Sequence, residues 1–178
     1  MALGKNYDGQ ECALAAALGL LGERWTLLVV RDAFYGVRRY SDFLAHLDVP
    51  RAVLADRLQA LVDAGVLEKQ RYQESPPRDE YVLTERGEEL WPVLHRIARW
   101  GERNMAGVSP RRLFRHTECG TRIDPSGHCP ACGGEIPPAE VETVLAPEVT
   151  SSRRDDPVTK ALAAGPHRLL EPLLPRSS

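Results

Sequence analysis

The order of the periodic apolar segments is the feature that most restricts the fold of this chain. Apolar residues recur at helical spacing over residues 14–21, fill much of residues 25–34, and form stripes over residues 40–47 and 54–62. Two strand-like segments follow, residues 66–72 and 79–83, joined by a connection that contains two prolines. The sequence therefore predicts four helices and then a β-hairpin.

Capping and turn residues mark where these helices begin and end. Pro50 suits the first turn of the fourth helix, where its missing N–H costs nothing, and Gly65 ends that helix. Thr84 can cap a last long helix, which Pro92 must kink or restart. We expect a winged helix-turn-helix fold: mainly α with a small β-hairpin wing, and a fourth helix able to enter a DNA major groove.

Composition limits the class of protein. The 178 residues are 43% apolar, so a packed core is expected, and the formal net charge is −2. This balance is not that of a non-specific nucleic-acid coat, so any DNA-binding surface must be local. No apolar run approaches the ~20 residues of a membrane span, and the first residues do not resemble a secretion signal. We expect a cytoplasmic protein.

The chain divides by composition into four parts. Residues 1–11 are predicted to be a flexible N-terminus and residues 12–106 the winged-helix DNA-binding and dimerisation domain. Residues 107–137 are rich in Cys, His and Gly and are predicted to be a small zinc-ribbon-like appendage. Residues 138–178 are expected to be a flexible tail without a stable helix, because Gly165, Pro166 and Pro172 interrupt its apolar residues.

The candidate DNA contacts lie on the fourth helix, just before the third helix, and on the hairpin. Small residues at the front of the fourth helix let its backbone approach base edges, Gln59 can pair with adenine, and the arginines can reach guanine or phosphate. We expect Asp56 to hold Arg57 or another cation. Alternatively, the arginines are an ordinary solvated face. The candidates are Arg38, Arg39, Pro50, Arg51, Ala52, Ala55, Gln59, Arg71 and Arg78.

From Cys12 to Arg103 the chain resembles the HxlR-type transcriptional regulators, which are related to the MarR group. The resemblance implies a dimeric bacterial repressor or activator that uses its first and last helices for dimerisation, with a small-molecule or oxidant effector in some members. The matching motifs are Gly22 with Trp25, Gly36 before Arg39-Tyr40, Leu54 with Arg57-Leu58, Ala64-Gly65-Val66-Leu67, Pro77-Arg78 with Tyr81 and Leu83-Thr84, and Trp100-Gly101.

The last helix supports a homodimer independently of the resemblance. Its apolar residues cover two neighbouring sides, which is more than one core contact needs. Alternatively, the whole apolar face packs within the monomer. A twofold dimer would place its two recognition helices ~34–36 Å apart and bind a pseudo-palindromic operator. The two sides comprise Leu90, Trp91, Leu94 and Ala98, and Val93, Ile97 and Trp100.

Cys12 lies at the amino end of the first helix, where the helix dipole favours a thiolate. The resembled family often carries a cysteine there, and some members use it to sense oxidants or electrophiles. Adjacent Glu11 argues mildly against an activated thiol. The alternative is that Cys12 is a small apolar residue at a dimer contact. Cys12 is therefore a candidate redox sensor.

His116, Cys119, Cys129 and Cys132 form two ligand-x-x-Cys-Gly halves. Together they offer a closed tetrahedral set for one structural zinc ion, and His128 could substitute for a ligand. Two alternatives remain open: a redox pair of Cys129 and Cys132, and a metal-free loop.

No nucleophile with a base partner, phosphate-binding loop or open metal site is present, so we do not expect an enzyme. The alternative function is a zinc-ribbon and winged-helix module that binds protein instead of DNA.

Overall fold

The computed structural model describes residues 7, 9–150 and 154–175. Residues 1–6 and 8, most of the predicted flexible N-terminus, lie outside the described residues, as do residues 151–153 and 176–178 of the predicted tail. The first four helices are α1 (Ala13–Leu21), α2 (Thr26–Phe34), α3 (Tyr40–Leu47) and α4 (Arg51–Asp63). Pro50 is the N-cap of α4. All four helices lie where the apolar periodicity predicts them.

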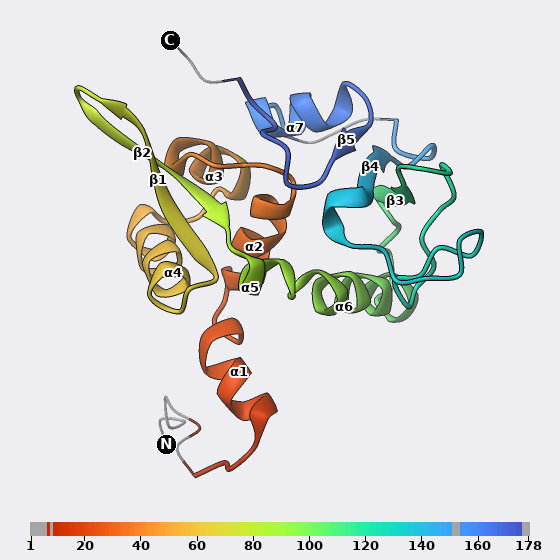
Figure 1. The fold of residues 1–178 in the computed structure, drawn as a ribbon, viewed down its shortest axis with the longest axis horizontal. Helices are drawn as coiled ribbons and strands as arrows, with labels where there is room; N and C mark the ends of the chain where they lie inside the picture. The colour runs from red at the N-terminus through yellow and green to blue at the C-terminus, as the bar shows by residue number, and fades with distance from the viewer. Residues whose placement is uncertain (1–6, 8, 151–153, 176–178) are drawn as a thin grey trace.

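The wing follows α4 as a two-stranded antiparallel hairpin, β1 (Leu67–Glu74) and β2 (Pro77–Leu83). Leu67 pairs with Leu83 at the buried base, and the rest of the hairpin projects from the body of the protein (Figure 1). The connection is shorter than predicted, because pairing continues to Glu74 and Pro77. Proline can occupy the first residue of a strand, where the missing donor is tolerated.

The predicted long helix is divided in two, as Pro92 requires. Thr84 caps the short α5 (Glu85–Glu88), its hydroxyl accepting from the Gly87 amide at 3.1 Å. α6 (Trp91–Asn104) then starts with Pro92 in its first turn. The ring of Trp91 lies 5.4 Å from that of Phe34 in α2 and 5.0 Å from that of Phe114 in the C-terminal sheet. Trp91 therefore joins the two halves of one core.

The predicted flexible tail is wrong for the described part of residues 138–175. A short 3-10 helix, η1 (Pro138–Glu140), precedes strand β4 (Val141–Leu145), which pairs with β3 (Arg112–His116) and with β5 (His167–Arg168) in the order β3-β4-β5. Between β4 and β5, α7 (Pro157–Ala163) packs on α3 and β4 (Figure 1). The sheet that carries the Cys/His segment therefore draws two strands from beyond residue 137.

The C-terminal elements are ordered because their apolar residues enter the same core as the helix-turn-helix. The segment after β5 also continues by backbone hydrogen bonds: the Leu170 amide donates to Phe34 at 2.8 Å and the Leu173 amide to Gly36 at 3.0 Å. No helical period reveals this docking. The buried apolar residues of the C-terminal part include Val141, Val144, Val158, Leu162 and Leu169.

Within the described residues, no single helix is long and apolar enough to cross a membrane; α1 and α2 meet that test only together, as a pair bent by 80°.

Candidate functional site

The outward side of α4 is open to solvent, as the sequence predicts. Leu54, Leu58 and Leu61 are fully buried on its inner side. Pro50 at the N-cap is exposed, and the hydroxyl of Tyr40 in α3 fixes the start of α4 by donating to the Arg51 carbonyl at 2.9 Å. A helix held by three buried leucines can present its other side to a groove. The exposed residues of that side are Arg51, Ala52, Ala55, Asp56 and Gln59.

Gln59 links the outer side of α4 to the base of the wing. Its amide nitrogen donates to Asp63 at 2.7 Å, and its amide oxygen accepts from Lys69 of β1 at 3.0 Å. These contacts fix the orientation of the amide, and its contact with a base edge stays a prediction.

The expected pairing of Asp56 with Arg57 is wrong. Arg57 lies 3.4 Å from Glu23 in the turn between α1 and α2. The reason is its place on the flank of α4, where it is half-buried and within reach of Glu23.

The wing arginines are exposed, on opposite strands. Arg71 of β1 forms an ion pair with Asp79 across the hairpin and lies 3.8 Å from Glu74. Arg78 pairs in register with Gln73 near the tip and forms no ion pair with any described residue. Of the two wing arginines, Arg78 is therefore the one without a carboxylate partner among the described residues.

Arg38 and Arg39 lie beneath the C-terminal segment, a contact that sequence reasoning missed. Arg38 donates to the Leu170 carbonyl at 2.9 Å, and Arg39 donates to the Pro175 carbonyl at 3.0 Å. Arg39 also lies 3.8 Å from Glu80; Arg39 is half-buried and Glu80 is buried. Arg38 and Arg39 are thus half-buried, unlike the exposed candidates on α4 and the wing, and their role at phosphates stays a prediction.

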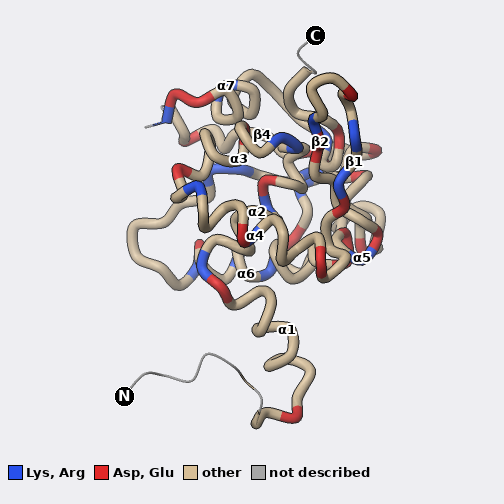
Figure 2. The backbone as a smooth tube through the Cα atoms, turned by 90° about the vertical axis from the view of Figure 1, so that its left-hand side faces the viewer, with Lys and Arg blue, Asp and Glu red and all other residues tan. Residues whose placement is uncertain are grey.

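Two helices expose apolar side chains. α1 projects from the body of the protein, carries no charged residue, and buries only Ala15 (Figure 2). α6 buries Trp91 but leaves other apolar residues on its outer side. The exposed apolar residues of the two helices are Leu14, Leu18, Val93, Ile97 and Trp100, the last with 53% of its surface exposed.

Cys12 is the N-cap of α1, where the sequence places it. Its Sγ accepts from the Ala15 amide at 3.3 Å, and the residue is exposed. This is the helix-terminal position that the sensing hypothesis requires, and the hypothesis stays a prediction.

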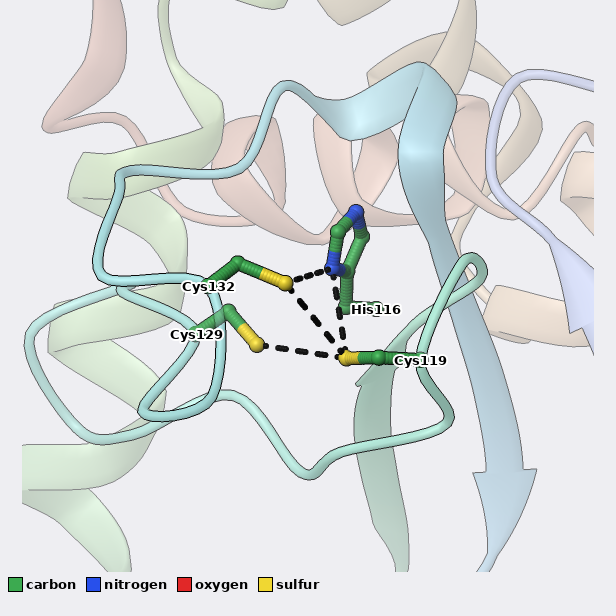
Figure 3. Close-up of side chains that lie close together, drawn as sticks. All are labelled: His116, Cys119, Cys129 and Cys132. Carbon is green, nitrogen blue, oxygen red and sulfur yellow. Dashed lines mark hydrogen bonds between the residues drawn. The ribbon is translucent and has the colours of Figure 1, made fainter.

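The four predicted metal ligands converge at the edge of the C-terminal sheet (Figure 3). The Cys119 sulfur lies 3.4 Å from His116 Nδ1 and 3.4 Å from the Cys129 sulfur. The Cys132 sulfur lies 3.3 Å from His116 Nδ1 and 3.7 Å from the Cys119 sulfur. Tetrahedral zinc, with bonds of about 2.0 Å to nitrogen and 2.3 Å to sulfur, has ligand–ligand edges of about 3.5–3.8 Å. This cluster can hold a metal ion.

The two halves form matching tight turns, as the Gly after each second ligand predicts. Gly120 and Gly133 have φ values of +68° and +77°, which a side chain would strain. The Gly120 amide donates to the His116 carbonyl at 2.9 Å, and the Gly133 amide donates to the Cys129 carbonyl at 2.8 Å. The turns bring the two halves together at one point.

The thiols of the cluster do not share one protonation state. Hydrogen bonds from Thr121 lower the pKa of Cys119 to about 6, whereas the neighbouring thiols of Cys119 and Cys129 raise the pKa of Cys132 to about 12. Adjacent thiolates repel each other, and a cation at their centre removes that conflict. This donor set could therefore hold a metal ion, and the convergence of all four residues does not favour a separate Cys129–Cys132 redox pair.

The ligand loops are held against α6. His95 Nε2 lies 2.9 Å from the Asp124 carbonyl oxygen, and Arg96 donates to the Ser126 carbonyl at 3.1 Å. His128, the spare ligand of the sequence interpretation, stands outside the cluster, with Nδ1 2.8 Å from the Ser126 hydroxyl. The loop between the two ligand halves therefore contacts the helix that carries the exposed apolar face.

Comparison with known proteins matches this architecture. The profile of the HxlR-like helix-turn-helix family covers residues 20–109. An uncharacterized HTH-type transcriptional regulator of Mycobacterium tuberculosis is 38% identical over 135 residues, which are 75% of this chain and 84% of the relative. The HTH-type transcriptional regulator YvaP of Bacillus subtilis, also uncharacterized, is 36% identical over 85 residues, 47% of this chain and 79% of YvaP.

Two solved structures extend the comparison. The crystal structure of PA1607, a candidate transcription factor, has a TM-score of 0.60 and 30% identity, and the match covers 83% of this chain and 98% of that one. Residues 1–109 make up less than two thirds of this chain, whereas the match with PA1607 covers 83% of it. The match therefore extends beyond residue 109 into the C-terminal part. The redox regulator HypR in its reduced form has a TM-score of 0.50 and 26% identity over 53% of this chain and 95% of HypR. The chain therefore belongs to the HxlR-like helix-turn-helix family of transcriptional regulators, which are not enzymes.

Proposed function

We propose that the protein binds a specific, pseudo-palindromic DNA operator as a homodimer, with α4 as its recognition helix. The observation that carries this proposal is the exposed outer side of α4, which stands over three fully buried leucines and beside the projecting wing. Arg51 and Gln59 would contact base edges from this helix, where Ala52 and Ala55 allow close approach. Arg71 and Arg78 would contact the phosphates beside the groove.

The dimer would form through α1 and α6. A nine-residue helix that buries one alanine gains little from its own monomer, and short isolated helices are marginal in water. The exposed apolar residues of α6 supply a second surface of the same character. Association through a twofold axis would cover both helices and present two recognition helices to one side of a duplex.

The proposal is tested by selecting binding sites from random double-stranded DNA, followed by affinity measurements on the selected site. We expect an inverted repeat whose half-sites are about one helical turn apart. Arg51→Ala should weaken binding to the selected site more than binding to random duplex, whereas Arg122→Ala, which removes an exposed charge on the metal loop, should change neither. Binding without sequence preference and without salt dependence would instead support the protein-interaction alternative.

We also propose that His116, Cys119, Cys129 and Cys132 hold one structural zinc ion. The set is closed, with three thiols and one imidazole and no position left for a substrate. The second imidazole nitrogen of His116 lies 3.5 Å from a Glu140 carboxylate oxygen without forming a hydrogen bond with it, so a small shift would give the hydrogen bond that orients a metal-bound histidine. Metal analysis of the purified full chain should give one zinc per chain.

A thiol-based regulatory role for Cys12 is the second candidate. The observation that favours it is the exposed Sγ at the amino end of α1, within the proposed dimer surface. An alkylating probe at neutral pH should label Cys12 faster than it labels free cysteine; equal or slower labelling contradicts the role.

As a DNA-binding regulator with bacterial relatives, the protein would act in the cytoplasm.

A further inference from the structure

A cavity of about 680 Å³ lies between the helix-turn-helix and the C-terminal part of the chain. One wall comes from α2 and α3, and the other comes from β3, β4 and α7. Its volume falls in the range of about 300–1,000 Å³ that small-molecule sites occupy. Because β3, β4 and α7 lie beyond residue 109, the segment that defines the family does not form this cavity alone.

The walls are largely apolar. Trp25, Leu28 and Leu47 contribute from the helix-turn-helix, and Leu145 and Leu162 contribute from the C-terminal part. Trp25 has a φ of 81°, a left-handed conformation that a large side chain rarely adopts. Residues held in such conformations gather at ligand sites. The lining therefore suits an apolar body.

The charged groups that line the cavity are basic. The described lining residues include four arginines and His46 but no Asp or Glu. Some of these cations have counter-charges just outside the cavity. Arg31 and His46 share Asp32, each at 2.7 Å, and Arg154 lies 3.4 Å from Asp156. These pairs offset part of the positive charge.

Arg112 differs, because its partners are neutral. Its Nε donates to the Thr143 hydroxyl at 2.7 Å and its Nη1 to the Leu162 carbonyl at 3.0 Å. Its Nη2 is buried and has no hydrogen-bond partner, and no described carboxylate pairs with the guanidinium. A partly buried guanidinium whose described partners are all neutral is costly, and an anion beside it would lower that cost.

We propose that this cavity binds a small organic anion, an aromatic or aliphatic carboxylate, with its apolar body between Trp25 and Leu162 and its carboxylate on Arg112. The ligand would place an anion beside a guanidinium whose printed hydrogen-bond partners, Thr143 and Leu162, are neutral. It would also touch His46 and Leu47 of α3, the helix directly before α4. An effect of the ligand on operator binding rests on the proposed function; the binding itself does not.

The first test is calorimetric titration of the full chain, without DNA, with 2-naphthoate and with its neutral analogue 2-naphthamide. The two probes share one apolar body and differ in charge. We expect the carboxylate to bind at least about tenfold more tightly, as one charge-assisted hydrogen bond allows. Equal affinities for the two probes, or no binding of either, would overturn the proposal.

Variants then locate the site. Ala163→Trp, on the exposed side of α7 at the cavity, should fill the space and abolish binding of both probes. Arg112→Met should remove the preference for the carboxylate, Arg112→Lys should retain part of it, and Arg168→Met, an exposed arginine outside the lining, should leave it unchanged. Naphthoate binding that survives Ala163→Trp in a folded chain would place the ligand elsewhere. Because DNA is absent from this assay, a failed operator experiment does not affect its outcome.

Discussion

Arg78→Ala tests whether the wing contacts the phosphate backbone. Arg78 is exposed near the wing tip and forms no ion pair with any described residue, so its removal should leave the hairpin intact. Each neutralised phosphate releases about 0.9 of a counterion from B-DNA. A homodimer loses two such contacts, so the slope of log affinity against log salt should become shallower by about 1.8.

The slope predicts a specific difference between wild type and variant. From 50 to 200 mM salt, a difference of about 1.8 in slope corresponds to a factor of about 12 in affinity. Wild-type affinity should therefore fall about twelvefold more than that of Arg78→Ala over this range, and the gap between the two proteins should narrow as salt rises.

Fluorescence anisotropy with the selected operator, measured at several salt concentrations, supplies the slopes. Arg122→Ala is the matched control, because it removes an exposed arginine on the metal loop and should preserve the wild-type slope. If Arg78→Ala binds more weakly by the same factor at every salt concentration, Arg78 does not contact phosphate, and the proposed position of the wing is refuted.

Three further predictions concern the metal, the dimer and the C-terminal segment. Cys132→Ser should lose the zinc and lower the melting temperature, because metal binding stabilises only the folded loops. Cys12→Ser should keep the wild-type zinc content and melting temperature. A Cys132→Ser variant that still holds one zinc per chain would contradict the ligand assignment. Trp100→Glu should shift sedimentation from dimer to monomer and the exposed neighbour Asn104→Glu should not; a dimeric Trp100→Glu would exclude α6 from the interface. Gly36→Ala should destabilise the protein to urea by about 1–3 kcal/mol and expose the C-terminal segment to protease, because φ is +78° and the new Cβ would lie 1.7 Å from the Glu171 carbonyl oxygen. Gly165→Ala, with nothing within 4 Å of its Cβ, is the control, and equal stability of the two variants would count against the docked segment.

The helix-turn-helix could be predicted because its signals are local. The period of the leucines in α4 gives the buried side, and Pro50, Gly65 and Thr84 mark the ends of elements within a few residues. The metal cluster could be predicted for the same reason: two ligands separated by two residues, with Gly next, specify a turn by themselves.

The C-terminal segment could not be predicted, because its order comes from contacts that are distant in sequence. Leu170 and Leu173 are fixed by backbone groups of Phe34 and Gly36, more than 130 residues earlier, and no periodicity encodes such pairing. The same segment supplies the carbonyls that hold Arg38 and Arg39. Two arginines that local reasoning assigns to DNA alone therefore also fasten the C-terminal segment to the helix-turn-helix.

Strand β3 connects the two sites of the C-terminal part. Arg112 begins this five-residue strand at the cavity, and His116 ends it at the metal cluster. β3 pairs along its whole length with β4, which contributes Leu145 to the same cavity. A metal ion on His116 would thus fix one end of the strand whose other end carries the proposed anion contact. Loss of the metal should weaken naphthoate binding, whereas filling the cavity by Ala163→Trp should leave the zinc content unchanged, since that residue lies on α7 at the cavity and is not one of the four candidate ligands.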